Sequence, residues 1–156
     1  MNQTLIVDEE YADWEREIVE IEHAHGEVTP ELVLWKASQK GSALHGQFQW
    51  DDTQAANEYR LLQASGLIRR VKVKIVDTST EEEREARRYT NVVVRTDEVE
   101  RRVYAPITQI VKSEELTRQM LDDAMRSLAS FRRKYATLSQ LAKVFAVIDE
   151  LEGAKA

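Results

Sequence analysis

The residues best suited to catalysis in this 156-residue chain are its three histidines and the acids near them. His45 precedes Asp51 and Asp52 in "SALHGQFQWDD", which could supply an acid–base pair. His23 and His25 lie two positions apart, so a helix would turn them to different faces, unlike the i, i+4 pair of zinc-binding helices. No glycine-rich loop, nucleophile elbow or cysteine supports either chemistry. The sequence therefore predicts a non-enzymatic protein without a metal or cofactor.

A second group of residues has the chemistry of nucleic-acid recognition. Glutamine and asparagine can read adenine edges, and arginine can read guanine or bind phosphate. The predicted nucleic-acid-binding residues are Gln54, Asn57, Arg60, Gln63, Arg69, Arg70, Lys72 and Lys74. The first four would lie on the outer side of a helix over 52–68, and the last four would hold backbone phosphates. The alternative is an ordinary solvated helix face with Arg60 paired to an acid.

Two helices and a turn are expected to position this second group. Thr29 and Pro30 are an N-cap and a first-turn proline, so a helix should run over 30–38 and end before Gly41. A short turn begun by Ser42 would let His45 bond a neighbouring carbonyl or carboxylate. This packing interpretation is favoured over an acid–base site.

The next helix, over 52–68, has a start signal and a predicted apolar side. Asp51 and Gln54 resemble a capping box, and Asp52 would favour the positive end of the helix. Phe48 and Trp50 lie just upstream, where they could cover the apolar side of the helix. That side is predicted to contain Ala55, Tyr59, Leu62, Leu67 and Ile68.

Alternating residues after Gly66 predict β structure. In "RRVKVKIVD" the valines and isoleucine alternate with basic residues, as in a half-buried strand over 71–76. Residues 77–88 are so polar that we expect a long connection or a solvated helical turn there. A hairpin is expected around Thr96–Asp97–Glu98, with Pro106 at an edge or a strand end.

The two ends of the chain are expected to be helical. Residues 8–25 carry the apolar stripe Tyr11–Trp14–Ile18–Ile21. A long helix should begin at Ser113, and a capping-box pattern at Thr137–Gln140 should start a last helix antiparallel to it. The N-terminal stripe would either join another chain or pack on the C-terminal pair.

Together these elements predict a mainly helical α+β chain. It would have a helix-turn-helix-like N-terminal unit, a small antiparallel β-sheet over 70–111 and a C-terminal helical hairpin. We place the domains at 1–111 and 112–156, the second oligomerising. The order of helix, turn, helix, strand and hairpin is that expected of a winged helix.

The charge distribution and hydropathy limit the cellular setting. The net charge is −6, and residues 1–50 hold ten acids against three bases, so nonspecific coating of nucleic acid is disfavoured while a local basic face remains open. No apolar run is long enough to span a bilayer, and the first residues lack signal-peptide features. We therefore expect a cytoplasmic protein with no membrane partner.

The stretch from Val28 to Val73 resembles a family of small proteins common in tailed-phage and prophage genomes. Its pattern is T-P-E-x-V, then S-x-L-H-x-x-F-x-W-D, then A-x-x-Y-R-x-x-Q-A-x-x-L-I. The matching residues are Thr29, Pro30, Glu31, Val33, Ser42, Leu44, His45, Phe48, Trp50, Asp51, Ala56, Tyr59, Arg60, Gln63, Ala64, Leu67 and Ile68. Ser65 departs from the basic residue that similar proteins often have. The resemblance implies a phage context and the host cytoplasm, but no particular chemistry.

The predicted function is that of a phage-type DNA-binding accessory or regulatory protein, winged-helix-like and acting as a homo-oligomer on double-stranded DNA. The alternative is an oligomeric protein-interaction module of a phage or prophage without nucleic-acid binding.

Overall fold

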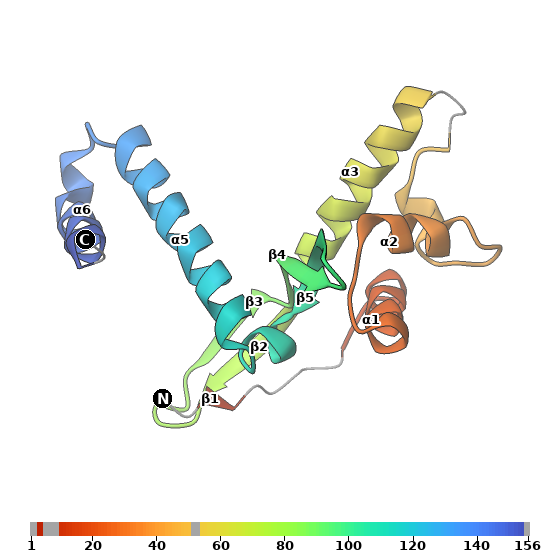
Figure 1. The fold of residues 1–156 in the computed structure, drawn as a ribbon, viewed down its shortest axis with the longest axis horizontal. Helices are drawn as coiled ribbons and strands as arrows, with labels where there is room; N and C mark the ends of the chain where they lie inside the picture. The colour runs from red at the N-terminus through yellow and green to blue at the C-terminus, as the bar shows by residue number, and fades with distance from the viewer. Residues whose placement is uncertain (1–2, 5–9, 51–53, 155–156) are drawn as a thin grey trace. The chain divides into compact units, whose positions relative to one another are not determined.

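The computed structural model describes residues 3–4, 10–50 and 54–154. The chain divides into two compact units, residues 1–113 and residues 114–156, and Figure 1 shows their elements. The fold is mainly helical α+β, as predicted. None of the helices in the described ranges is long and apolar enough to cross a membrane.

The described part of unit 1 contains the helices predicted over 8–25, 30–38 and 52–68 and the turn predicted after Ser42, and it adds a short helix that was not predicted. They are α1 (Asp13–His25), α2 (Pro30–Ala37), the 3₁₀ turn η1 (His45–Gln47), α3 (Gln54–Arg70) and the short α4 (Ile107–Ile110). Thr29 caps α2 by accepting a hydrogen bond from the Leu32 N–H at 3.2 Å, as expected. Gly26 ends α1 with φ 73°, a conformation that favours glycine. The predicted Asp51 cap lies outside the described residues.

The described strands of unit 1 form two antiparallel sheets. The first has the order β1 (Gln3–Thr4), β2 (Lys72–Asp77), β3 (Glu83–Arg87), and the second pairs β4 (Tyr89–Thr96) with β5 (Val99–Pro106). Asp97 and Glu98 have φ of 48° and 67°, values that suit a two-residue hairpin turn. The predicted hairpin and its end at Pro106 are confirmed. An isolated antiparallel bridge joins Val28, between α1 and α2, to Tyr104 of β5.

Strand β3 corrects the expectation that 77–88 is a loop or helical turn. Its residues pair in register with β2, from Lys72 opposite Arg87 to Val76 opposite Glu83. Ala86 is the one partly buried residue of this strand, so the sequence lacks the alternation of apolar and polar residues that would predict a strand. The ladder of backbone hydrogen bonds and the polar cross-strand pairs replace the missing apolar face. The single sheet expected over 70–111 is consequently two sheets.

The core of unit 1 includes the N-terminal stripe. Ile18 and Ile21 are buried in it, and Tyr11 and Trp14 pack against it from the side. The other buried members are Val28, Val33, Ala37, Leu44, Phe48, Ala64, Leu67, Ile68, Val71, Tyr89 and Tyr104. Both expectations for the stripe, another chain or the C-terminal helices, are therefore wrong: it is covered within unit 1.

Helix α3 is rotated relative to the prediction. Tyr59 and Leu62, expected in the core, are 55% and 69% exposed, whereas Ala64, Leu67 and Ile68 are buried. The helix has apolar residues on two sides, and only its C-terminal half meets the core. Sequence spacing could not choose between the two sides, because the choice depends on which side α2 and β4 cover.

Unit 2 is the predicted C-terminal helical hairpin. It comprises α5 (Glu114–Lys134), the 3₁₀ turn η2 (Ser139–Leu141) and α6 (Ala142–Gly153). Phe131 and Phe145 approach to 6.3 Å between ring centroids, and Arg132 Nε lies 3.2 Å from an Asp149 oxygen. The predicted Thr137–Gln140 capping box is wrong. Leu138 and Leu141 are the N-caps of η2 and α6, and neither end has a side-chain cap, because a 3₁₀ turn intervenes before the α-helix.

Candidate functional site

The loop before α3 is held by a carboxylate from α1. Glu17 accepts hydrogen bonds from Ser42 Oγ at 2.5 Å, from the Ala43 N–H at 2.9 Å and from the Leu44 N–H at 3.3 Å. Burial raises the pKa of Glu17, but these three hydrogen bonds outweigh it and hold the pKa below its ordinary value. Glu17 therefore works as a cap for the 42–48 turn.

His45 packs between the end of α2 and Trp50. Its Nδ1 donates to the Ala37 carbonyl at 2.9 Å, and its ring stacks on Trp50 with centroids 4.6 Å apart. Trp50 Nε1 in turn donates to the His45 carbonyl at 2.9 Å. The predicted hydrogen bond from His45 to a carbonyl is confirmed. Asp51 and Asp52, the acids considered as its partners, lie outside the described residues.

Two of the predicted base-reading residues hold this same loop. Arg60 Nε donates to the Gln49 carbonyl at 2.6 Å, and its guanidinium lies 5.0 Å from the Trp50 ring centroid. Gln63 Oε1 accepts from the Gln49 N–H at 3.3 Å. Both side chains therefore turn toward the loop before α3.

The other two predicted base-reading residues are Asn57 and Gln54. Asn57 is exposed and lines a groove between α2 and α3. The side chain of Gln54 lies outside the part that the structure describes. The outward side of α3 instead carries Tyr59 and Leu62.

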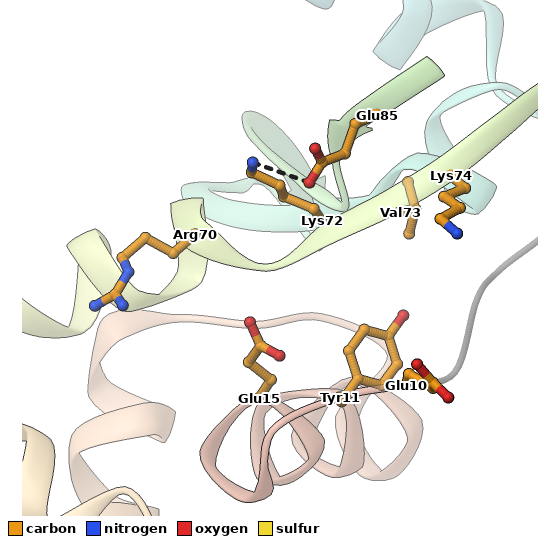
Figure 2. Close-up of a pocket in the computed structure, with 8 residues that line it drawn as sticks. All are labelled: Glu10, Tyr11, Glu15, Arg70, Lys72, Val73, Lys74 and Glu85. Carbon is orange, nitrogen blue, oxygen red and sulfur yellow. Dashed lines mark ion pairs between the residues drawn. The ribbon is translucent and has the colours of Figure 1, made fainter. Parts of the chain in front are cut away.

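Three of the predicted phosphate-binding residues come together. Arg70, Lys72 and Lys74 line one concavity of about 210 Å³, and Figure 2 shows them along its upper wall. Glu10 and Glu15 face them from the start of α1. The arrangement concentrates positive charge along β2 but places acids across the concavity.

Arg87 is a fourth member of this basic row that sequence reasoning missed. It lies directly opposite Lys72 in the β2–β3 register, so both side chains leave the same face of the sheet. Glu85 lies 2.9 Å from Lys72 and offsets part of the repulsion. Arg87 could not be recognised because its segment was predicted to be a loop. Arg69, also predicted, is exposed at the end of α3. We call Arg70, Lys72, Lys74 and Arg87 the basic row.

A buried ionic network also went unpredicted. Arg88 donates to both oxygens of Glu22, at 2.7 and 3.0 Å, and to the Tyr11 hydroxyl at 3.2 Å, while the Tyr89 hydroxyl donates to Glu22 at 2.7 Å. Burial raises the pKa of Tyr89, and its hydrogen bond to Glu22 adds to the rise. Burial lowers the pKa of Arg88, but the bonds to Glu22 outweigh it and the net shift is upward. The network ties α1 to β4 and has no free group to offer a substrate.

The site is interpreted from its own geometry. Comparison with protein-family models, with curated proteins and with solved structures finds no match for this chain. In the described ranges, no three histidine, aspartate or glutamate side chains gather in a way that could hold a metal ion.

Proposed function

We propose that the chain is a non-enzymatic DNA-binding accessory or regulatory protein of a phage or prophage, acting in the host cytoplasm. The element order supports this proposal. Val28, between α1 and α2, bridges to β5, and β5 pairs with β4, so the β4–β5 hairpin is joined to the helical part of unit 1. Winged-helix DNA-binding domains use this order, here with the β2–β3 hairpin inserted before the wing.

The observation that carries the proposal is the basic row. Lys72 and Arg87 are like charges placed directly opposite each other on an exposed sheet face. Such a pair destabilises a sheet, and its cost is recovered when a polyanion neutralises it. Lys74 extends the row along β2, and Arg70 and Arg69 add charge at the end of α3.

The acids of the chain oppose phosphate binding by the basic row less than the net charge of −6 suggests. Two of the α1 acids are used internally, Glu17 by the 42–48 turn and Glu22 by Arg88. Exposed charges more than about 8 Å apart are largely screened at physiological salt, so the local field decides phosphate binding. Glu10, Glu15 and Glu85 remain close enough to reduce affinity.

The orientation of α3 changes how the DNA would be read. Arg60 and Gln63 are engaged by Gln49 and Trp50, so they cannot read bases without releasing that loop. We therefore propose that phosphate contacts dominate and that sequence preference is weak.

The test is a fluorescence anisotropy titration with short duplex DNA at several salt concentrations. Lys74→Ala with Arg87→Ala should weaken binding to all sequences and reduce the salt slope by about 0.9 per lost phosphate contact. The matched control is Lys40→Ala with Lys112→Ala, which removes the same charge from exposed positions elsewhere in unit 1. If both variants lose the same DNA affinity, the loss comes from the change in net charge and not from the basic row. No binding by the natural chain at low salt would overturn the proposal.

A protein-interaction module without nucleic-acid binding is the second candidate. The exposure of Tyr59 and Leu62 on the outward side of α3, and of Trp35 on α2, favours it. Tyr59→Ser with Leu62→Ser should leave phosphate-driven DNA binding unchanged. If these substitutions abolish DNA binding while the basic-row variant retains it, the basic row is not the binding surface.

A further inference from the structure

The concavity beside the basic row has two walls of opposite charge. Figure 2 shows Arg70, Lys72 and Lys74 along one wall and Glu10 and Glu15, at the start of α1, along the other. Among the residues that line the concavity, no ion pair joins one wall to the other. The two walls therefore face each other across an open space of about 210 Å³.

Contacts outside the concavity hold both walls in place. Glu15 accepts a hydrogen bond from the Ala12 N–H at 2.9 Å, and the Tyr11 hydroxyl belongs to the buried ionic network. The Arg70 guanidinium lies 5.2 Å from the ring centroid of Trp14. A ligand would therefore meet charges that are already positioned, which lowers the entropic cost of binding it.

One charged group on each wall has no partner in the described part of the chain. Lys72 pairs with Glu85 at 2.9 Å, whereas Arg70 and Glu10 form no hydrogen bond or ion pair. The planar guanidinium of Arg70 matches the geometry of a carboxylate. The Glu10 carboxylate can accept hydrogen bonds from an ammonium group.

The charge balance of the concavity indicates what class of ligand it suits. The bases that line it are Arg70, Lys72 and Lys74, and the acids are Glu10, Glu15 and Glu85, so the charges cancel. A ligand with a single charge is attracted by one wall and repelled by the other. A ligand that carries both charges is attracted by both walls.

The remaining lining suits a short hydrocarbon link between the two charges. Tyr11 and Val73 are the other two lining residues, and Val73 is almost fully buried. The volume is below the roughly 300 Å³ at which sites for drug-sized molecules begin, so the ligand must be small.

We propose that this concavity binds a small zwitterion of the amino-carboxylate class, with its carboxylate on Arg70 and its ammonium group on Glu10 and Glu15. Such a ligand would cover Arg70 and Lys74 of the basic row and so compete with DNA phosphates. That competition rests on the proposed function. The zwitterion site itself does not, because its ligand is measured without DNA.

The first test titrates the full chain with glycine, γ-aminobutyrate and ε-aminocaproate, followed by NMR chemical shifts of the backbone amides. Each zwitterion is compared with its singly charged analogues, which are acetate, butyrate or hexanoate and an alkylamine of matching length. At least one zwitterion should bind about tenfold more tightly than both of its analogues. The shifts should be largest over residues 10–15 and 70–74.

The second test changes the selectivity of each wall. Glu10→Gln should remove the preference for the zwitterion and strengthen binding of the carboxylate analogue. Arg70→Gln should also remove the preference but strengthen binding of the alkylamine. Because the two variants change selectivity in opposite directions, loss of folding cannot produce both results.

The matched controls are Glu58→Gln and Arg69→Gln. They remove the same charges from exposed positions of α3 that do not line the concavity, so both should keep the preference for the zwitterion. Two outcomes would overturn the proposal. In one, no zwitterion of the series binds the natural chain more tightly than its analogues. In the other, the control variants lose the preference as fully as Glu10→Gln and Arg70→Gln.

Discussion

Two clusters of unit 1 place the neighbouring residues Arg87 and Arg88 in opposite surroundings. In the network of Glu22, Arg88 and Tyr89 the side chains are buried, and Arg88 and the Tyr89 hydroxyl donate to the Glu22 carboxylate at 2.7 to 3.0 Å. In the basic row Lys72 and Arg87 are exposed and lie opposite a like charge. The first cluster is satisfied by the fold and holds it together. The second lies at the surface, where solvent reaches it and Glu85 offsets part of its charge.

The largest effect is expected from breaking the buried cluster. Arg88→Ala leaves the Glu22 carboxylate buried without its charged partner, which should cost about 3–5 kcal/mol of unfolding free energy. Chemical denaturation of the full chain measures this loss. Arg95→Ala is the control, since Arg95 forms an exposed pair with Glu100 and should change stability by less than about 1 kcal/mol. Equal effects would show that burial does not distinguish the two pairs.

A smaller effect is expected at Glu17, which is half-buried. Glu17→Ala removes the cap of the 42–48 turn and should cost about 1–2 kcal/mol. Because its pKa is lowered in the folded chain, the ionised form contributes stability above the ordinary value of 4.5 and loses it as pH falls through the lower folded value.

The pH dependence gives a second readout for this residue. Glu17→Gln should flatten the fall in unfolding free energy below pH 4.5, measured by denaturation at a series of acidic pH values. If the variant loses unfolding free energy at acidic pH as steeply as the natural chain, other carboxylates cause the pH dependence.

The smallest stability effect is expected in the basic row. Arg87→Thr removes a like-charge pair and adds a residue suited to strands, so unfolding free energy should stay the same or rise by a few tenths of a kcal/mol. Thermal denaturation measures this change, and the anisotropy titration should show weaker DNA binding by the same variant. A marked loss of stability would mean that Arg87 is structural, like Arg88.

Much of the local structure could be predicted from sequence because its causes are local. Thr29 and Pro30 mark the start of α2, Gly26 ends α1, and Asp97–Glu98 lies at the hairpin turn. The packing role of His45, Phe48 and Trp50 was also predictable, because aromatic residues just before a helix can cover its side. Strand β3 could not be predicted, because its residues are nearly all polar and show no alternation between apolar and polar side chains.

The basic row was only partly predictable, because one of its members reaches it through strand pairing and not through sequence spacing. Arg70, Lys72 and Lys74 follow one another along α3 and β2, so their clustering is set by sequence spacing. Arg87 joins them through the register of β3.

The sequence by itself determined the longer helices, the Thr29 cap of α2 and the β4–β5 hairpin, since these depend on residues a few positions apart. Only the tertiary structure decided which side of α3 is buried, because that side is the one against which α2 and β4 pack. It also decided that Glu22 and Arg88, 66 positions apart, form a buried pair. Whether two residues far apart in sequence are buried together depends on how distant elements pack. Neither the charge pattern nor the hydrophobic periodicity along the chain predicts that packing.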